Sequence, residues 1–180
     1  MPPSRKCLSP GFTLVELILV MVLAGALAAL GAAPFFDRAG YDAAAYADQL
    51  GALVRYGQKV AIAQNRPVFV RLDGGSVALC FAGTACGDAD RVRPASAASA
   101  GAACGGAPWA CEVNPAGISY AARDSAGGAV AAFYFDALGR PCAQGDAFGA
   151  GQSTFQTLTL SVAGGGARAI VIEQETGYVH

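Results

Sequence analysis

The sequence predicts an α+β protein in which a long N-terminal helix packs on an antiparallel β-sheet. An apolar run covers residues 12–33, and residues 41–64 continue with the apolar periodicity of an amphipathic helix. Short β-rich segments separated by glycine-containing turns then occupy residues 65–180. The helical and β-rich segments are segregated along the chain, which favours the α+β class. At 180 residues the chain has room for one globular domain in addition to a helical anchor.

The first helix follows a short polar leader that contains Arg5 and Lys6. Residues 11–16 have the sequence Gly-Phe-Thr-Leu-Val-Glu, and the apolar run that follows ends at Pro34. The 22 residues from 12 to 33 form about 33 Å of helix, which is enough to cross the hydrocarbon core of a bilayer. The sequence therefore predicts a single membrane-spanning helix.

Glu16 is the only charged residue between Phe12 and Pro34. A carboxylate in a bilayer-length apolar segment costs roughly 2.5–3.5 kcal/mol on insertion scales, and such residues usually mark function. The position of Glu16 therefore indicates that its carboxylate has a partner.

The leader charges, the glycine, the phenylalanine and the glutamate at this spacing resemble the type III signal of type IV pilins and type II secretion pseudopilins. In that family prepilin peptidase, a membrane aspartyl peptidase, cleaves after the glycine and methylates the new N-terminal phenylalanine. The resemblance implies cleavage between Gly11 and Phe12 and N-methylation of Phe12. It also implies an assembly role for Glu16, because the fifth mature residue in the family neutralises the amine of a neighbouring subunit.

The same resemblance divides the chain into a prepilin leader peptide over residues 1–11 and a transmembrane helix over residues 12–34. A periplasmic amphipathic part of the long helix then covers residues 35–64, and a β-rich globular pilin domain covers residues 65–180. The implied partners are prepilin peptidase, other pilins or pseudopilins of the same filament, and the inner-membrane assembly platform.

An ordinary secretory signal peptide is the alternative interpretation of the N-terminus, since it also combines a positive region with an apolar region. It predicts loss of everything before about Ala33. It does not explain why Glu16 lies within the apolar region or why Gly11 directly precedes Phe12.

The charge distribution predicts a single-pass inner-membrane protein with a periplasmic C-terminal domain. The leader charges stay on the cytoplasmic side by the positive-inside rule. Removal of the leader takes Arg5 and Lys6 from the 12 basic residues and leaves 10 against 13 acidic ones, a net charge of about −3. The chain contains no basic block, so general affinity for nucleic acid is not expected.

Five cysteines follow the predicted anchor, in a compartment where disulfides persist. Short separations close at low entropic cost, so the expected pairs are Cys80–Cys86 and Cys104–Cys111. Cys142 is then left as a free thiol. Five cysteines also permit other pairings, and at least one of them must stay unpaired within the chain.

No metal or other cofactor is expected. The sixth cysteine, Cys7, lies in the leader, no C-x-x-C motif occurs, and the only histidine is the terminal His180. Asp88 and Asp90 provide oxygen ligands for calcium, but two acids in a loop fall short of the six to eight oxygens that calcium takes. The same single histidine argues against a Ser-His-Asp or Cys-His catalytic pair, so we do not expect an enzyme.

One apolar stripe at i, i+3, i+4 and i+7 spacing predicts that residues 41–64 form a core-facing helix. The residues of the stripe are Leu50, Leu53, Val54, Gly57, Val60 and Ala61. Tyr46 and Tyr56 are expected to flank the stripe. Residues 65–67, with the sequence Asn-Arg-Pro, end the helix because a residue before proline avoids the α region.

The first strands are expected at residues 68–72 and 76–81, joined as a hairpin by Asp-Gly-Gly at 73–75. A long irregular loop held by disulfides follows at residues 83–110. The later strands are predicted at residues 117–122, 129–135, 154–162 and 168–174, with the alternation of the third slipping near Gln156. Residues 164–166, three glycines, join the last two strands as a hairpin.

Three further segments are similar to minor pilins of the GspH/FimT type. Residues 56–63 resemble their "A-R-x-x-A" helix segment, residues 135–141 their "F-D-x-x-G-R" turn, and residues 176–179 their terminal "T-G-x-V". The segment before the first hairpin also resembles minor subunits of mannose-sensitive haemagglutinin pili. Some FimT-like relatives bind DNA through arginines near the C-terminus, but this tail carries Glu173 and Glu175 instead.

We therefore expect a minor pilin or pseudopilin, a structural subunit of a periplasmic filament in a type II secretion system or a type IV pilus. The alternative function is a pilus-tip adhesin or a DNA-binding minor pilin that uses the loop 83–110. Arg91 and Arg93 in this loop are the basic residues on which DNA binding would depend, although solvated loop charge explains them equally well.

Overall fold

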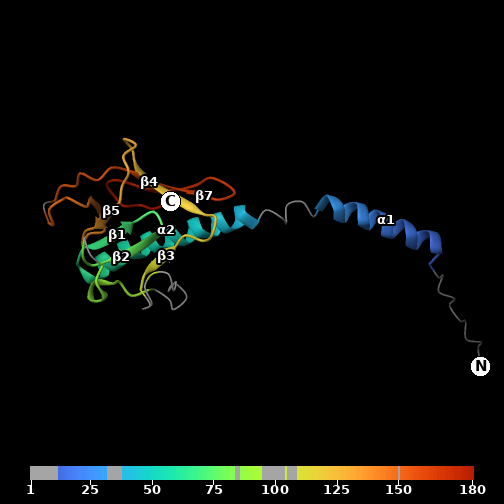
Figure 1. Ribbon diagram of the computed structural model, residues 1–180, viewed down its shortest axis with the longest axis horizontal. Helices are drawn as coiled ribbons and strands as arrows, with labels where there is room; N and C mark the ends of the chain where they lie inside the picture. The colour runs from blue at the N-terminus through green and yellow to red at the C-terminus, as the bar shows by residue number, and fades with distance from the viewer. Residues whose placement is uncertain (1–11, 32–37, 84–85, 95–103, 105–108, 150) are drawn as a thin grey trace, which may run out of the picture. The chain divides into compact units, whose positions relative to one another are not determined.

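The computed structural model describes residues 12–31, 38–83, 86–94, 104, 109–149 and 151–180 (Figure 1). The chain divides into two compact units, Met1–Asp37 and Arg38–His180. The described part of the first unit is helix α1 (Leu14–Gly31) with the two residues before it. The predicted leader 1–11 and the predicted passage of the helix through Pro34 lie outside the described residues.

Thr13 caps helix α1. Its Oγ1 accepts a hydrogen bond from the backbone N–H of Glu16 at 3.3 Å, and its carbonyl accepts one from Leu17 at 3.2 Å. Threonine is a preferred N-cap because its hydroxyl satisfies a backbone donor that has no partner within the helix. The order Thr-x-x-Glu is the sequence pattern of a capping box, which explains locally why the helix begins here.

The second unit begins with helix α2 (Arg38–Gln64). All six residues of the predicted apolar stripe are buried. Tyr46 is also buried, at 1% exposure, so the expectation that it only flanks the stripe is wrong. Asn65 ends the helix in the left-handed region with φ 49°, a common C-terminal conformation for asparagine.

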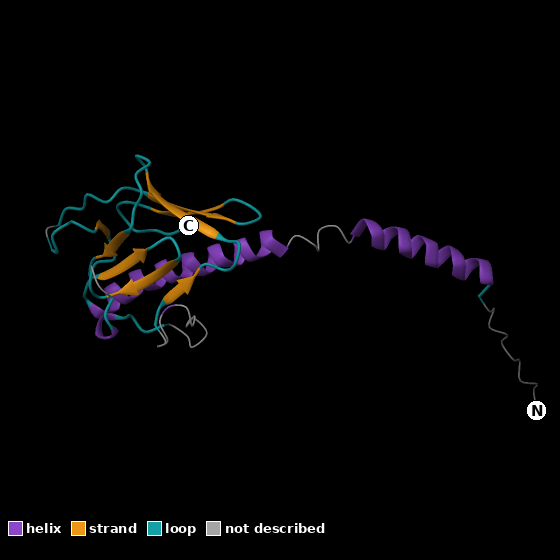
Figure 2. Cartoon of the chain, viewed as in Figure 1, coloured by secondary structure: helices purple, strands orange, loops and turns teal. Residues whose placement is uncertain are grey.

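The strands of the described part form two antiparallel sheets (Figure 2). They are β1 (Val68–Leu72), β2 (Ser76–Cys80), β3 (Cys111–Val113), β4 (Ser119–Asp124), β5 (Ala132–Phe135), β6 (Pro141–Ala143), β7 (Leu158–Ala163) and β8 (Arg168–Ile172). The larger sheet has the order β3-β2-β1-β5-β6, and the smaller has the order β4-β7-β8. The predicted α+β class, with a helix packed on antiparallel sheet, is confirmed.

Helix α2 contacts strands of both sheets and shares one core with them. Val70 and Leu79 of the larger sheet, and Leu160 and Ile172 of the smaller, are buried in this core. Gly57 brings the helix close to β2, because a Cβ at this position would lie 3.0 Å from a methyl group of Leu79. The glycine in the predicted stripe therefore acts through close packing.

The opposite face of the larger sheet carries two smaller clusters. On β2 and β3, Ala78, Cys80 and Cys111 pack with Trp109. On β1, β5 and β6, a second cluster contains Phe69, Tyr134 and Cys142. Both faces of this sheet are thus covered, and this explains the run of buried residues in β1 and β2 where alternation would leave one face polar.

The two hairpins that were predicted from glycine-containing turns are confirmed. Strands β1 and β2 pair with Leu72 opposite Val77, and β7 and β8 pair with Val162 opposite Arg168. Asp73 stabilises the first turn, since its Oδ1 accepts a hydrogen bond from the N–H of Gly75 at 3.0 Å.

The turn of the first hairpin also ties the two sheets together. The hydroxyl of Tyr120 on β4 donates to the carbonyl of Ser76 at 2.7 Å and accepts from the N–H of Gly74 at 3.0 Å. Burial raises the pKa of Tyr120 to about 12, so this hydroxyl stays a donor across the physiological range. Tyr46 of α2 reaches the same turn through Asn114. The hydroxyl of Tyr46 donates to Oδ1 of Asn114 at 2.6 Å, and Nδ2 of Asn114 donates to the carbonyl of Gly74 at 2.9 Å.

Several predicted strand boundaries need correction. The strand expected at 129–135 is divided, because Ala129 bridges to Arg123 of β4 whereas Ala132–Phe135 pairs with β1. Residues 154–157 do not belong to a strand, and β7 begins at Leu158, immediately after the slip in alternation. Strands β3 and β6 were not predicted because three residues are too short to show a period.

Candidate functional site

The structure places Phe12 and Glu16 at the start of helix α1. All described side chains from residue 12 to residue 28 are exposed, and Phe12 is 76% exposed. Within the described part of the chain the Glu16 carboxylate has no ion-pair or hydrogen-bond partner. Gly11, on the other side of the predicted cleavage point, lies outside the described residues.

Among the residues that the structure describes, no helix combines the length and the apolar character that crossing a bilayer requires.

Three segments that are distant in the sequence meet at the side chain of Gln58. Its Nε2 donates to the carbonyl of Gly139 at 2.8 Å and to the carbonyl of Thr176 at 3.0 Å. Gln58 belongs to segment 56–63, Gly139 to segment 135–141 and Thr176 to segment 176–179. The segments with family-like sequences are therefore joined by one carboxamide, and we call this contact the Gln58 junction.

Two glycines with positive φ make the Gln58 junction possible. Gly139 has φ 81°, and a Cβ there would lie 2.7 Å from Cδ1 of Ile62. Gly177 has φ 64°, and a Cβ there would lie 2.8 Å from Nε2 of Gln58. Residues with a side chain rarely adopt a positive φ, and a Cβ at either position would also collide with Ile62 or Gln58. Glycine is therefore required at both positions for two separate reasons.

Asp136 and Arg140 shape the turn that presents Gly139. Oδ1 of Asp136 accepts hydrogen bonds from the N–H groups of Leu138 and Arg140, each at 2.9 Å. Oδ2 of Asp136 lies 3.0 Å from Nε and 2.8 Å from Nη2 of Arg140. The aspartate is thus a turn-forming residue whose charge is balanced by the arginine.

The C-terminal tail is held against both β8 and helix α2. Val171 and His180 exchange two backbone hydrogen bonds, at 2.8 Å and 3.1 Å, which add the tail to the edge of the smaller sheet. Nη1 of Arg55 on α2 donates to the carbonyl of Val179 at 3.3 Å. The imidazole of His180 lies 3.1 Å from the carboxylate of Glu173. These contacts hold the tail against β8 and α2, and Val179 within it is buried.

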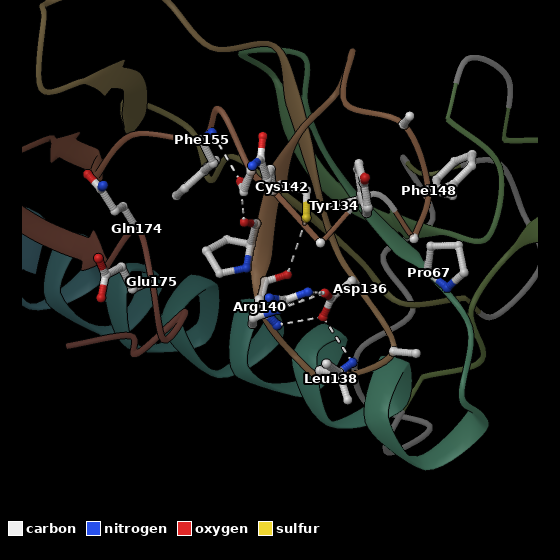
Figure 3. Close-up of a pocket in the computed structure, with 17 residues that line it drawn as sticks. Pro67, Tyr134, Asp136, Leu138, Arg140, Cys142, Phe148, Phe155, Gln174 and Glu175 are labelled. Carbon is white, nitrogen blue, oxygen red and sulfur yellow. Dashed lines mark hydrogen bonds and ion pairs between the residues drawn. The ribbon is translucent and has the colours of Figure 1, made fainter.

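A pocket of about 650 Å³ lies beside strand β6 (Figure 3). We call it the β6 pocket. Its apolar lining comes mainly from Pro67, Tyr134, Leu138, Pro141, Phe148 and Phe155. Its polar lining comes from Asp136, Arg140, Cys142, Gln152, Ser153, Gln174 and Glu175. In the view of Figure 3, Gln174 and Glu175 lie on one side, Phe148 and Pro67 on the other, and Arg140 and Asp136 between them.

Asp146 closes the outer edge of β6. Its Oδ2 accepts hydrogen bonds from the N–H groups of Ala143 at 2.8 Å and Thr154 at 2.9 Å, and its Oδ1 accepts the Thr154 hydroxyl at 2.6 Å. Burial opposes the charged form of Asp146, but these hydrogen bonds outweigh burial and lower its pKa. The edge strand is thereby protected from pairing with another chain.

Cys142 lies in the wall of the β6 pocket as a buried free thiol. Its sulfur is 3.9 Å from the carbonyl of Arg140, and it packs with Tyr134. Burial raises the pKa of the Cys142 thiol and also raises the pKa of the Tyr134 hydroxyl. The thiolate form that reacts with disulfides is therefore suppressed at neutral pH.

The disulfides join Cys80 to Cys86 and Cys104 to Cys111, the same pairs that loop length favours. Indole Nε1 of Trp109 donates to the carbonyl of Cys104 at 2.6 Å, so the second disulfide and the tryptophan form one packed group. Parts of the predicted loop 83–110 lie outside the described residues, namely 84–85, 95–103 and 105–108.

The described part of this loop is more regular than expected. A short 3₁₀ helix, Asp88–Asp90, is followed by a β-bridge between Arg91 and Cys80. Arg91 pairs with Asp88 at 2.7 Å and lies over the ring of Trp109 at 4.9 Å. The carbonyl of Arg93 accepts the hydroxyl of Tyr56 on α2. Of the two arginines considered for DNA binding, Arg91 thus has side-chain contacts within the fold, whereas Arg93 contributes its backbone carbonyl and its side chain is exposed. Asp88 is paired with Arg91.

Sequence reasoning did not identify Gln58, the β6 pocket or the role of Asp146. Gln58 lies within residues 56–63, the helix segment with a GspH/FimT-like sequence. The sequence does not show whether a glutamine side chain bridges two backbone groups or is solvated. Gly139 and Gly177 were available in the sequence as a clue, since each follows a turn-forming residue at a short spacing, and both have positive φ in the structure. The β6 pocket is built from residues 67 to 175, and such convergence depends on the tertiary fold.

Comparisons with known proteins gave the following result. No family model matches the chain, and no curated protein matches it. Two similar solved structures are crystal forms of the type IV minor pilin FimU from Pseudomonas aeruginosa. The first has a TM-score of 0.45 and 16% identity and covers 79% of this chain and 86% of that chain. The second has a TM-score of 0.44 and 17% identity and covers 74% and 87% respectively.

Proposed function

We propose that this protein is a minor pilin or pseudopilin, a structural subunit of a periplasmic filament in a type II secretion system or a type IV pilus. The observation that carries the proposal is the sequence of residues 11–16, which leads into the apolar helix α1 (Leu14–Gly31). Apart from Glu16, the described side chains of α1 are apolar on every face and exposed. A helix that is apolar all round requires lipid or other helices around it, and a filament subunit encounters both in turn.

The membrane stage of this life cycle uses the segment 12–34 as a single-pass anchor in the inner membrane. Arg5 and Lys6 keep the leader on the cytoplasmic side and direct the C-terminal unit to the periplasm. The disulfides Cys80–Cys86 and Cys104–Cys111 support this location, because such bonds persist in an oxidising compartment.

The assembly stage exchanges lipid for neighbouring subunits. The inner-membrane assembly platform and the other pilins of the filament are the partners in this step, and Glu16 pairs with the amine of a neighbouring mature N-terminus. The Gln58 junction supports assignment to the minor-subunit class, because it brings together the three segments with GspH/FimT-like sequences.

Processing provides the direct test of this proposal. The full chain with a C-terminal tag is expressed in cells with prepilin peptidase and in cells without it, and the mature N-terminus is determined by mass spectrometry. We expect a chain that begins at N-methylated Phe12 in the first strain and a chain that retains residues 1–11 in the second. A mature chain that begins near Ala33 in both strains would establish signal-peptide cleavage and refute the proposal.

A Gly11→Leu variant provides a matched control for this experiment. The variant keeps the leader charges and the apolar helix but replaces the small residue before the cleavage point. We expect it to remain uncleaved and inserted in the membrane when the peptidase is present. Normal cleavage of this variant would show that residues 11–16 are not the recognition signal.

A further inference from the structure

The β6 pocket has the dimensions of a small-molecule site. Its volume of about 650 Å³ lies within the range of roughly 300–1,000 Å³ that is typical of ligand pockets. The pocket is formed by the C-terminal unit alone and uses none of the residues to which cleavage or assembly was assigned. Its occupancy is therefore independent of the proposed filament function.

Several polar side chains at the β6 pocket are exposed and available to a ligand. Those of Gln152, Gln174 and Glu175 line the pocket, and none has a hydrogen-bond or ion-pair partner among the described residues. Arg140 uses Nε and Nη2 on Asp136, which leaves Nη1 available. Two amides, one carboxylate and part of a guanidinium therefore surround this space (Figure 3).

The apolar side of the β6 pocket presents an aromatic ring in a fixed orientation. Phe148 is 64% exposed, although its ring centre lies only 5.2 Å from that of Tyr134 and 5.9 Å from that of Phe69. Edge and tilted contacts of this kind hold an aromatic ring in place. An exposed ring that is held by two others offers a prepared apolar face at one end of the pocket.

The charge of the pocket argues against anions and against simple cations. Asp136 neutralises Arg140, which leaves Glu175 as the unbalanced charge and disfavours phosphate, sulfate and nucleic acid. A cationic group can only donate hydrogen bonds, so it satisfies Glu175 but not the N–H donors of Arg140, Gln152 and Gln174. A ligand that complements all of these groups both donates and accepts hydrogen bonds and covers an aromatic face.

A short neutral saccharide meets these requirements. Each hydroxyl both donates and accepts a hydrogen bond, as the mixture of amide, carboxylate and guanidinium groups demands. The C–H groups on the face of a sugar ring provide apolar surface for Phe148. Because Phe148 and Gln174 lie on opposite sides of the pocket, we propose that the β6 pocket binds a neutral saccharide of two or more units, with Phe148 beneath one ring and with Gln174, Glu175 and Arg140 at the hydroxyls of the next.

The test uses the full-length protein in a zwitterionic detergent without a sugar headgroup. Four neutral disaccharides, namely maltose, lactose, mannobiose and chitobiose, are each added to about 50 mM, and saturation-transfer NMR records contact with the protein. For a ligand of this size we expect a dissociation constant on the order of 1 mM for at least one of these sugars. Glucose 6-phosphate and a lysine-containing tripeptide serve as the anionic and cationic probes.

Three variants locate the binding. Phe148→Ala and Gln174→Ala should each weaken sugar binding at least fivefold. Tyr178→Ala is the matched control, because Tyr178 is also 64% exposed but does not line the pocket, and it should bind as the wild type does. Near-ultraviolet circular dichroism establishes that each variant is folded.

The proposal is overturned by any of three results. The first is that none of the four neutral sugars contacts the wild-type protein. The second is that sugar binding persists unchanged in both Phe148→Ala and Gln174→Ala. The third is that the phosphate or the tripeptide binds whereas the neutral sugars do not. None of these results affects the N-terminal processing experiment, so the two proposals fail separately.

Discussion

The two helices of this chain differ in where their apolar residues lie. Helix α2 has one apolar stripe, and the residues of that stripe are buried against the sheets of its own unit. Helix α1 is apolar on every face, and its described side chains are exposed from residue 12 to residue 28. The sequence of α2 is thus explained by contacts within its own unit, whereas the described part of the first unit contains nothing that covers the apolar faces of α1.

A matched pair of leucine substitutions tests this difference most strongly. Leu50 on α2 is fully buried, and Leu50→Ala should reduce the free energy of unfolding of the C-terminal unit by about 2–5 kcal/mol. Leu23 on α1 is 55% exposed, and Leu23→Ala should change the same quantity by less than about 0.5 kcal/mol. The fluorescence of Trp109, the single tryptophan of the chain, reports unfolding of this unit. Equal losses from the two substitutions would contradict the comparison.

The Gln58 junction gives the next largest effect. Gln58→Ala leaves the carbonyls of Gly139 and Thr176 without their shared donor, so we expect a loss of about 1–3 kcal/mol in the free energy of unfolding. Lys59→Ala is the control on the next, exposed position, and it should stay within about 0.5 kcal/mol of the wild type. Denaturant titration followed by Trp109 fluorescence measures both variants. If they are equally stable, the junction is only a surface contact.

The sequence was sufficient to predict those parts of the fold that depend on local pattern. The stripe of α2, the stop before Pro67 and both glycine turns follow from periodicity and turn chemistry. The two disulfides join the cysteines nearest each other along the chain, so short loop closure was enough to select them.

The features that escaped prediction depend on tertiary contacts. Tyr46 is buried in the main core, and its hydroxyl bonds to Asn114, a partner that is 68 residues away. Ala129 bridges to β4 of the smaller sheet, whereas β5 pairs with β1 of the larger sheet. The sequence has one continuous β pattern over this segment, so it does not show where the chain passes from one sheet to the other. Gln58 and Asp146 are ordinary polar residues in the sequence, and only the positions of distant backbone groups make them bridging residues. The β6 pocket was not predictable for the same reason.

A smaller, pH-dependent effect is expected from Asp146. Its pKa is lowered in the folded state, so the carboxylate stabilises the fold above its unfolded pKa of about 3.9. This stability is lost as the pH falls through the lower folded-state pKa. Asp146→Asn should therefore cost about 1 kcal/mol at pH 7 and less at pH 3.

Urea titrations of the wild type and the variant at both pH values measure the Asp146 effect. Asp48→Asn is the control, since the exposed carboxylate of Asp48 has no hydrogen-bond partner in the described structure. The control should show the same small difference at both pH values. A cost of Asp146→Asn that stays constant from pH 7 to pH 3 would show that its charge is not involved.

The smallest effect on the folded chain is expected at Glu16, where the consequence for assembly is greatest. Glu16 is exposed on α1 and has no side-chain partner in the described structure, so Glu16→Ala should leave the unfolding of the C-terminal unit unchanged. Cleavage and membrane insertion should also persist, because the proposed peptidase signal depends on Gly11 and the leader more than on the acid. Assembly should fail, since an incoming subunit brings the charged amine of Phe12 into apolar surroundings. An unpaired charge there costs several kcal/mol, and the carboxylate of a neighbouring subunit offsets this cost.

Co-purification of the tagged protein with the filament, or with its partner minor subunits, measures the assembly defect. Glu16→Asp keeps the charge on a shorter side chain and should give an intermediate yield, whereas Glu16→Gln keeps the size without the charge and should behave like the alanine variant. This order separates electrostatic pairing from packing, because packing predicts that glutamine is the mildest substitution. If Glu16→Ala assembles at the wild-type level while remaining cleaved and inserted, the exposed acid of α1 has no pairing role. The comparison between the two helices would then have to rest on hydrophobic contacts alone.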